Sequence, residues 1–274
     1  EEMYDLSRVS SPKKVLVIGG GVAGMQAALI AARRGHHVEL MEREGRLGGL
    51  LALAARPPFK QDLDLLAPRF EHALRAAGVA VHLNSEADVD SVRAAHADAV
   101  ILAAGSVPVF PGFCKAAPNA VTADRVLSGA VAPGTKVLIM GGGLIGCETA
   151  EFLAERGHAV TVLEMQPEVA RDMEGRTRRY MMPRLKKYGV TLLTGTQVLH
   201  IDDRGIVTVK TPDGGERTLP AFDTLVAAVG YRPETRLAEE LRAAGIPFTS
   251  IGDCDHVAKI LNAAESGLAA GAAL

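Results

Sequence analysis

The 274-residue sequence is poor in cysteine and has no excess of charge of either sign. Its three cysteines, Cys114, Cys147 and Cys254, form no CxxC pair, and its eight histidines show no metal-ligand spacing. These absences exclude a disulfide scaffold and a zinc site, and they favour a reducing, cytoplasmic environment. Lys and Arg number 30 against 32 Asp and Glu, a net charge of −2. We therefore expect no nucleic-acid partner and no polybasic membrane anchor.

Residues 15–32 carry no charge and superficially resemble a membrane span or a signal sequence. Several glycines and Gln26 interrupt this run, so a short buried strand, a tight glycine turn and a helix explain it better. The same pattern recurs from Lys136 with Glu148 and Glu151 inside it, and both charges would be costly in lipid. With 48% hydrophobic and 23% charged residues, the chain has the composition of a globular protein.

Residues 14–42 and 136–164 are two copies of one pattern. They align without a gap at an offset of 136 − 14 = 122, and 14 of the 29 positions are identical. Each copy reads as an apolar strand, the motif GGGxxG, a helix of about four turns and a second strand that ends in Glu. Residues 98–108 and 223–233 also match, at an offset of 125. Repetition at this length predicts two βαβ-based domains rather than a solenoid.

The two units are expected to differ in the middle. Residues 205–222 alternate apolar and polar side chains around Thr-Pro-Asp-Gly-Gly, which predicts a β-hairpin in the second unit. At the corresponding place the first unit has only a helical stretch, residues 88–96. Proline-rich segments at 108–118 and 132–134 are interpreted as the crossings between the two domains.

The glycines of the first copy have the spacing of a dinucleotide-binding turn. The first glycine permits a tight turn, the second lets the backbone approach a pyrophosphate, and the third lets helix and strand pack closely. The N-terminus of the helix then offers free N–H groups and a positive dipole end to the phosphates. Glu42 lies 42 − 24 = 18 residues after the third glycine, where a carboxylate can accept hydrogen bonds from ribose hydroxyls.

The second copy repeats both features, with its motif from Gly141 to Gly146 and with Glu164 another 18 residues on. A tight turn without a ligand is the alternative for either copy, but the strand–helix frame, the acid and the duplication together favour nucleotide binding. Two dinucleotide sites in one chain imply two cofactors that exchange electrons, most simply a flavin and a nicotinamide.

The last 26 residues indicate which site holds the flavin. Residues 249–254 read as a strand that ends in Gly252-Asp253, and a helix is expected from about His256 to Leu274. An Asp at a strand end could bind a sugar-like hydroxyl chain, and the helix N-terminus could stabilise negative charge on a reduced flavin. The alternative, in which Asp253 caps that helix, is compatible with this role.

These motifs together resemble the flavoproteins with two dinucleotide-binding domains, the group of glutathione and thioredoxin reductases. The sequence is most similar to the C-terminal half of the 2,4-dienoyl-CoA reductase, enoate reductase and trimethylamine dehydrogenase family, over essentially all 274 residues. Segments 47–51, 57–60 and 251–260 carry much of this likeness. The resemblance implies an α/β fold of two Rossmann-like, glutathione-reductase-like domains, the second inserted into the first. It places an FAD-binding domain at 1–110 and 224–274 and an NAD(P)H-binding domain at 111–223.

The resemblance also implies the residues of both sites. The expected FAD residues are Gly19, Gly21, Val22, Ala23, Gly24, Glu42, Arg43, Gly49, Leu50, Ala87, Ala104, Gly105, Gly252 and Asp253. Of these, Gly49 and Leu50 would lie near the pyrophosphate and flavin, and Ala87 near adenine. The expected nicotinamide residues are Gly141, Gly143, Leu144, Ile145, Gly146, Glu148, Glu164 and Gly230.

In the larger members of this family, nicotinamide reduces FAD and the electrons pass through an iron–sulfur cluster to FMN in a barrel domain. The present sequence has neither the barrel nor a four-cysteine cluster motif, and it begins at Glu1. It is therefore expected to be either an excised half or a subunit that works with a separate FMN/Fe–S partner. Trimethylamine dehydrogenase-like members keep ADP in the equivalent pocket, so a non-redox, ADP-binding docking module is the alternative. The missing CxxC argues against thioredoxin-reductase-like dithiol chemistry.

Hydride transfer between nicotinamide and flavin needs little acid–base help, so no catalytic acid, base or nucleophile is predicted. Glu148 could meet the nicotinamide carboxamide, or it could be a solvated first-turn Glu. Glu164 favours NADH because a carboxylate repels the 2′-phosphate of NADPH. Arginines follow it closely and could reach that phosphate, so NADPH stays possible; they are Arg171, Arg176, Arg178 and Arg179. Cys254 could approach the flavin, but a small buried residue is the simpler interpretation.

Overall fold

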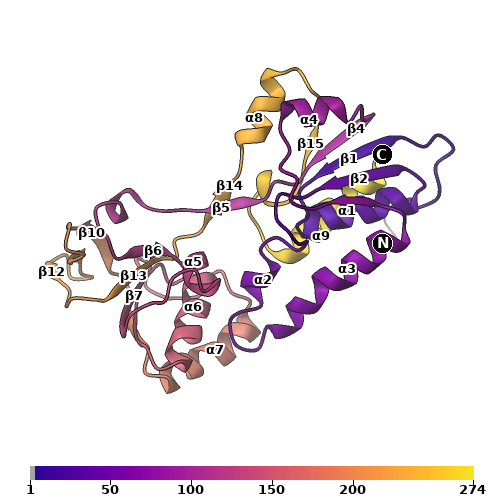
Figure 1. Ribbon diagram of the computed structural model, residues 1–274. Helices are drawn as coiled ribbons and strands as arrows, with labels where there is room; N and C mark the ends of the chain where they lie inside the picture. The colour runs from indigo at the N-terminus through magenta and orange to yellow at the C-terminus, as the bar shows by residue number, and fades with distance from the viewer. Residues whose placement is uncertain (1–3) are drawn as a thin grey trace. The chain divides into compact units, whose positions relative to one another are not determined.

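The computed structural model describes residues 4–274, which divide into two units. The first unit comprises the chain up to Ala55, together with Asp62–Val107 and Arg232–Leu274. The second comprises Arg56–Gln61 and Pro108–Tyr231. Figure 1 labels many of the helices and strands of both units.

A five-stranded parallel sheet forms the centre of the first unit, in the order β15-β4-β1-β2-β3. In chain order its strands are β1 (Lys14–Ile18), β2 (His37–Met41), β3 (Ala80–His82), β4 (Ala99–Leu102) and β15 (Thr249–Ser250). The central strand β1 is apolar at almost every position because helices cover both faces of the sheet. Val15 and Val17 pack on one side, whereas Leu16 and Ile18 pack on the other.

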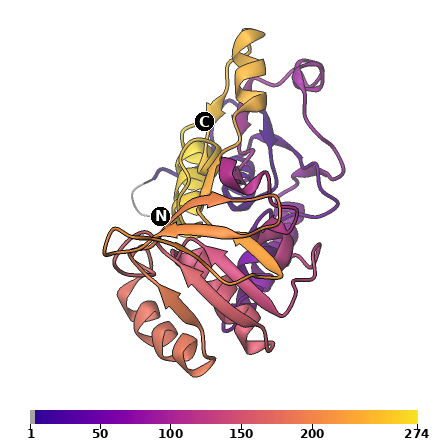
Figure 2. The ribbon, with the colours of Figure 1, turned by 90° about the vertical axis from the view of Figure 1, so that its left-hand side faces the viewer.

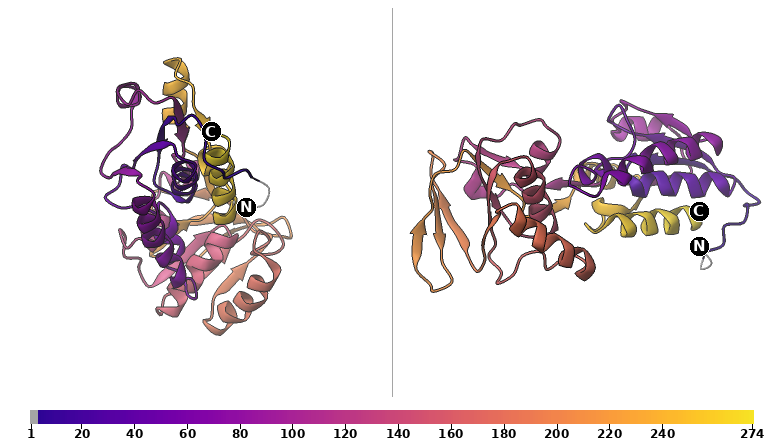
Figure 3. Two further views of the ribbon diagram at one scale, coloured as in Figure 1. Left: turned by 90° about the vertical axis from the view of Figure 1, so that its right-hand side faces the viewer. Right: turned by 90° about the horizontal axis from the view of Figure 1, so that it is seen from below.

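Three helices cover the first face, and two cover the second. The first group is α1 (Val22–Arg33), α3 (Leu66–Ala76) and α9 (Ile260–Ala272), and the second is α4 (Val89–Ala94) and α8 (Arg236–Ala243). Helix α9 lies directly along α1, as the right-hand view of Figure 3 shows. Gly267 and Gly271 make this close approach possible, since a Cβ at Gly267 would lie 2.3 Å from the carbonyl oxygen of Ala23. Shorter pieces complete the unit, namely α2 (Leu51–Ala54) and the 3-10 turns η1 (Gln61–Leu65) and η3 (Gly252–Cys254).

The second unit repeats this sheet in the order β6-β13-β7-β8-β9, again all parallel. Its strands are β6 (Ala120–Thr122), β7 (Lys136–Met140), β8 (Ala159–Leu163), β9 (Thr191–Leu193) and β13 (Thr224–Ala227). One face is covered by α5 (Ala123–Leu127), α6 (Leu144–Glu155) and α7 (Gly175–Lys187). The sequence prediction of two Rossmann-like α/β units is thus confirmed.

A three-stranded antiparallel sheet covers the other face of the second unit, where the first unit has helices. It consists of β10 (Gln197–Ile201), β11 (Val207–Lys210) and β12 (Glu216–Thr218), drawn in orange in Figure 2. Its apolar side chains pack on Leu138 and Met140 of β7, and η2 (Gly112–Cys114) joins the same core. The hairpin predicted within 205–222 is therefore confirmed, as is the helix within 88–96 in the first unit.

The chain passes between the units at places that differ partly from those expected. One crossing follows Val107 and another follows Tyr231, and the segments there pair as β5 (Ser106–Pro108) and β14 (Tyr231–Pro233). Residues 132–134, expected to be a crossing, lie inside the second unit. The boundary expected after residue 223 falls before β13, which is the counterpart of β4 and must join the second sheet to complete it.

The C-terminal helix begins later than the sequence suggested. Helix α9 starts at Ile260; η3 ends at Cys254, and residues 255–259 between them are not helical. Lys259 is its N-cap residue, so Asp253 does not cap this helix. Within residues 4–274, no helix has the length and apolar character needed to cross a membrane.

The contact between α9 and α1 provides a test of the packing. We expect Gly267→Ala to lower the free energy of unfolding by about 1–3 kcal/mol, because the new methyl group would overlap a backbone carbonyl that cannot move aside. Gly175→Ala is the control, since a Cβ at this helical glycine meets no atom within 4 Å. Thermal and urea unfolding followed by circular dichroism would compare the two, and equal stability of both variants would contradict the close packing.

Candidate functional site

At the turn after β1, the start of helix α1 approaches the end of the strand closely at one point. A Cβ at Gly24 would lie 1.9 Å from the carbonyl oxygen of Gly19, a distance that no side chain tolerates. Gly19 itself has φ of +105°, in the region that favours glycine. The third glycine of the motif is thus required by packing and the first by backbone conformation.

The start of α1 is open to an anion. A Cβ added at Gly21, the N-cap residue, would meet no atom within 4 Å. Among residues 4–274, no group accepts a hydrogen bond from the N–H of Val22 or Ala23. Unpaired N–H groups at a helix N-terminus, together with the helix dipole, favour phosphate binding.

Glu42, at the end of β2, is held against this turn. Its Oε2 accepts a hydrogen bond from the N–H of Gly20 at 2.6 Å, and its Oε1 accepts one from the N–H of Glu44 at 2.8 Å. The side chain is buried, yet a carboxylate oxygen can accept more than one hydrogen bond. Glu42 is therefore fixed where the hydroxyl groups of a ribose could also reach it.

Other predicted residues of the first unit gather at the same turn. A Cβ at Gly252 would lie 2.7 Å from that of Ala23, and one at Gly49 would lie 3.2 Å from the Cα of Gly21. The oxygen of Ala103, next to Ala104 and Gly105, lies against Gly19. Asp253 accepts a hydrogen bond from the Ser106 hydroxyl at 2.9 Å. The ends of β1, β4 and β15 thus meet at one edge of the sheet.

Three predicted residues are less directly placed. Arg43 and Leu50 are exposed, and Arg43 forms an ion pair with its neighbour Glu44, at 3.5 Å. Ala87 is buried in the core beneath α4 and α8, so only its backbone could face an adenine.

The turn after β7 reproduces the first one closely. A Cβ at Gly146 would lie 1.9 Å from the oxygen of Gly141, and Gly141 also has φ of +105°. Glu164 accepts hydrogen bonds from the N–H groups of Gly142 and Gln166 at 2.6 and 2.8 Å. Gly230 follows β13, near Ala228, whose oxygen lies against Gly141 as that of Ala103 lies against Gly19. The duplication seen in the sequence therefore extends to the hydrogen bonds of both acids.

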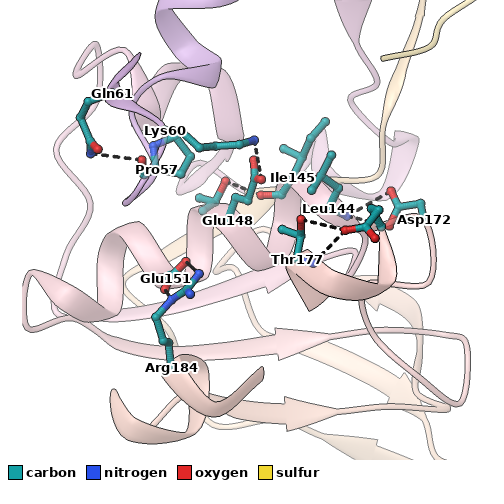
Figure 4. Close-up of polar contacts among 12 residues, drawn as sticks. Pro57, Lys60, Gln61, Leu144, Ile145, Glu148, Glu151, Asp172, Thr177 and Arg184 are labelled. Carbon is teal, nitrogen blue, oxygen red and sulfur yellow. Dashed lines mark hydrogen bonds and ion pairs between the residues drawn. The ribbon is translucent and has the colours of Figure 1, made fainter. Parts of the chain in front are cut away.

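One contact distinguishes the second turn. The carboxylate of Asp172 accepts the N–H of Leu144, the first residue of α6, with oxygens at 2.9 and 3.1 Å (Figure 4). The next N–H, that of Ile145, meets no acceptor within residues 4–274. The sequence analysis did not identify Asp172, because nothing in its surroundings marks it as a ligand of the turn.

Glu148 is buried rather than solvated. Its side chain is 8% exposed, and its Oε1 lies 2.5 Å from Nζ of Lys60 (Figure 4). Burial raises the pKa of Glu148, and the positive charge of Lys60 opposes that rise. The interpretation of Glu148 as a solvated first-turn Glu is wrong, because Lys60 belongs to the 56–61 segment that packs with the second unit.

A second buried carboxylate lies one turn further along α6. Glu151 is fully buried and receives two hydrogen bonds from the Arg184 guanidinium on α7, one of them at 3.2 Å. The Arg184 guanidinium also stacks 4.6 Å from the ring centre of Phe59. Residues 56–61 thus take part in the contacts of both of these buried carboxylates.

Two of the arginines after Glu164 already have a partner on another side chain. Arg178 pairs with Glu168 at 3.0 Å, whereas Arg171 donates to the side chain of Gln166 at 3.3 Å. Since the N–H of Gln166 also donates to Glu164, Gln166 links Arg171 to this acid. Arg176 and Arg179 are exposed on α7.

All three thiols are buried. Burial raises the pKa of Cys114 to about 11 and that of Cys147 to about 12. Burial also raises the pKa of Cys254, whose Sγ contacts the carbonyl oxygens of Leu102 and Ile251. A packed, protonated thiol agrees with the structural interpretation of Cys254.

Comparison with known proteins gives one consistent family. Residues 13–257 match the pyridine nucleotide-disulphide oxidoreductase family. Over 96% of its length the chain is 39% identical to an NADH oxidase of Thermoanaerobacter brockii and 37% identical to a bilirubin reductase of Mediterraneibacter gnavus. It spans 41% and 42% of those two proteins.

Solved structures agree with this match. A 2-naphthoyl-CoA reductase superposes with a TM-score of 0.93 at 31% identity, over 99% of this chain and 41% of that one. A histamine dehydrogenase from Rhizobium sp. 4-9 superposes with a TM-score of 0.87 over 98% of this chain and 45% of that one, but at 21% identity it shows only the shared fold.

The pair between Lys60 and Glu148 leads to a stability prediction. We expect Lys60→Met to lower the free energy of unfolding by about 2–3 kcal/mol, because it leaves a buried carboxylate unpaired. Glu148→Gln should cost less than about 1 kcal/mol, since the amide is neutral and Lys60, 30% exposed, can reach water. The double variant should regain most of the loss. Arg75→Met, in the exposed pair with Glu71, is the control, and a Lys60→Met effect no larger than that control would contradict the prediction.

The thiols provide a second test. At pH 8 the native protein should react with an alkylating reagent far more slowly than the denatured chain, because all three thiols are buried and burial keeps them protonated. Mass spectrometry should find three modified cysteines only after denaturation. Rapid labelling of Cys254 in the folded protein would instead indicate a reactive thiol.

Proposed function

Because the chain belongs to the pyridine nucleotide-disulphide oxidoreductase family, we propose that it binds FAD in the first unit and NADH in the second and acts as an FAD-dependent NAD(P)H oxidoreductase. The duplicated turn is the observation that carries this proposal: each copy combines a close strand–helix approach, a helix N-terminus and a held carboxylate. When bound, the flavin accepts a hydride from the dihydronicotinamide and passes the electrons onward.

The residues of the first unit fit an FAD. The open N-terminus of α1 would hold the pyrophosphate, and Glu42 would bind the adenosine ribose. Gly252 and Asp253, brought to the same edge of the sheet, would face the flavin side of the dinucleotide. The contacts at α1 and Glu42 would serve ADP equally well, so an ADP-binding docking module is the second candidate.

In the second unit, Leu144, Ile145 and Glu164 would hold the pyrophosphate and ribose of the nicotinamide dinucleotide. Glu164 favours NADH because its carboxylate would repel a 2′-phosphate, although Arg171 lies close enough to moderate that effect. Glu148 would approach the nicotinamide carboxamide from its buried position beside Lys60.

The electron acceptor is proposed from the length of the relatives. The NADH oxidase and bilirubin reductase matched here extend well beyond the part that this chain covers, at 41% and 42% of their lengths. We infer that electrons pass to a partner domain or subunit that carries FMN and an iron–sulfur cluster. Because the three cysteines of this chain are unpaired, we infer that the protein works in a reducing cytoplasm.

Release and identification of the bound nucleotide test the proposal. Purified protein should be yellow, should yield FAD on acid extraction and should bleach when NADH is added without oxygen. NADPH should bleach it more slowly. Recovery of ADP alone would select the docking module, and a colourless protein that FAD cannot reconstitute would remove the enzyme proposal.

A matched pair of variants assigns the two turns. A Cβ at Gly21 meets no atom within 4 Å, and the atoms nearest to one at Gly143 belong to the Asp172 carboxylate, so valine at either position should fold and should obstruct phosphate. Gly21→Val should lose FAD. Gly143→Val should keep FAD but weaken NADH binding about 10- to 100-fold, as expected for lost charge-assisted hydrogen bonds. If Gly143→Val instead lost FAD and Gly21→Val weakened NADH binding, FAD would belong to the second turn and NADH to the first.

A further inference from the structure

The two turns differ at one position that the duplication allows us to identify. In the first unit the N–H of Gly48 donates to the oxygen of Gly20 at 2.8 Å, and in the second the N–H of Ala170 donates to the oxygen of Gly142 at 2.6 Å. Both pairs keep the offset of the repeat, 170 − 48 = 122 and 142 − 20 = 122. The loops that follow the second strand of each unit are therefore equivalent.

Two residues beyond this hydrogen bond, the first unit has Leu50 and the second has Asp172. The side chain of Leu50 cannot accept a hydrogen bond, and the N–H of Val22 meets no acceptor within residues 4–274. Asp172 instead binds the N–H of Leu144, the counterpart of Val22, with both carboxylate oxygens near it. The fold does not require this carboxylate, because the first unit forms the same turn without it.

The Asp172 carboxylate occupies the position where an anion would bind. It lies at the N-terminus of a twelve-residue helix, and a Cβ at Gly143 would be 3.2 Å from Oδ2 of Asp172. A phosphate oxygen bound to Leu144 N–H would need the same place, and its negative charge would be repelled by the carboxylate. Asp172 is exposed and has no other hydrogen-bond partner among residues 4–274, so its side chain is free to turn toward water.

We propose that Asp172 sets the nucleotide affinity of the second turn by holding the Leu144 N–H until the pyrophosphate of the incoming dinucleotide displaces it. The inference rests on the proposed function of this turn as the nicotinamide site. Competition by an internal carboxylate weakens binding, which suits a dinucleotide that must leave after every turnover. The first turn has no such competitor, which suits a cofactor that stays bound.

Equilibrium and stopped-flow binding of NAD⁺ test this role. Asp172→Leu installs the residue of the first unit, and Asp172→Asn removes the charge but keeps an acceptor oxygen. We expect NAD⁺ to bind both variants more tightly, about tenfold for Asp172→Leu, as for one hydrogen-bonded competitor removed. Association should become faster in proportion, because the competitor occupies the free turn, and the FAD content should be unchanged. NAD⁺ also makes the measurement independent of electron transfer.

Glu168→Gln is the matched control, because it removes one negative charge from the same loop without touching the turn. It should change the dissociation constant less than twofold. If the wild-type protein binds NAD⁺ and neither Asp172 variant binds it more tightly, the proposed role of Asp172 is wrong. The same follows if Glu168→Gln increases the NAD⁺ affinity as much as the Asp172 variants do. Neither result would contradict the nicotinamide site itself. Binding of NAD⁺ by none of the proteins would overturn the nicotinamide site itself, whereas binding by only the Asp172 variants would support the competition.

Discussion

The contact between the third glycine and the carbonyl of the first is the constraint on which both units depend. At Gly24 and at Gly146 the helix approaches the strand so closely that only a hydrogen atom fits. This approach places the first N–H groups of α1 and α6 at the turn that follows β1 or β7. Glu42 and Glu164, each fixed by hydrogen bonds, would then complete the proposed site for phosphate and ribose without any side chain from the helix.

The duplicated sheets and turns could be predicted from the sequence because glycine spacing and apolar runs are local signals. The hairpin from β11 to β12 followed from a turn cluster between alternating residues. Partners distant in sequence could not be predicted. Glu148 looks like a solvated helix residue until Lys60, 88 positions earlier, is found to pack beside it. The helix start expected at His256 is too early, because residues 255–259 between η3 and α9 are not helical and no local signal in the sequence marks them as a link.

Comparison of the two copies distinguishes residues that the fold requires from residues that occur in one unit alone. At the offset of 122, Glu148 and Glu151 of α6 correspond to Gln26 and Leu29 of α1. Leu29 is buried in an apolar core, so the same helix position packs well without a charge. The acids of α6 therefore belong to the second unit's own contacts, which Lys60 and Arg184 complete.

Stability alone does not explain these ion pairs. A buried ion pair often contributes no more to the free energy of unfolding than apolar packing does, because two charges must be desolvated to form it. The pairs of α6 do something that apolar packing would not: they bind residues 56–61 through Lys60 directly and through the stacking of Phe59 on Arg184. Because Glu148 lies less than two helical turns from Leu144, the segment carrying Lys60 and the proposed nucleotide site are joined through one short stretch of α6.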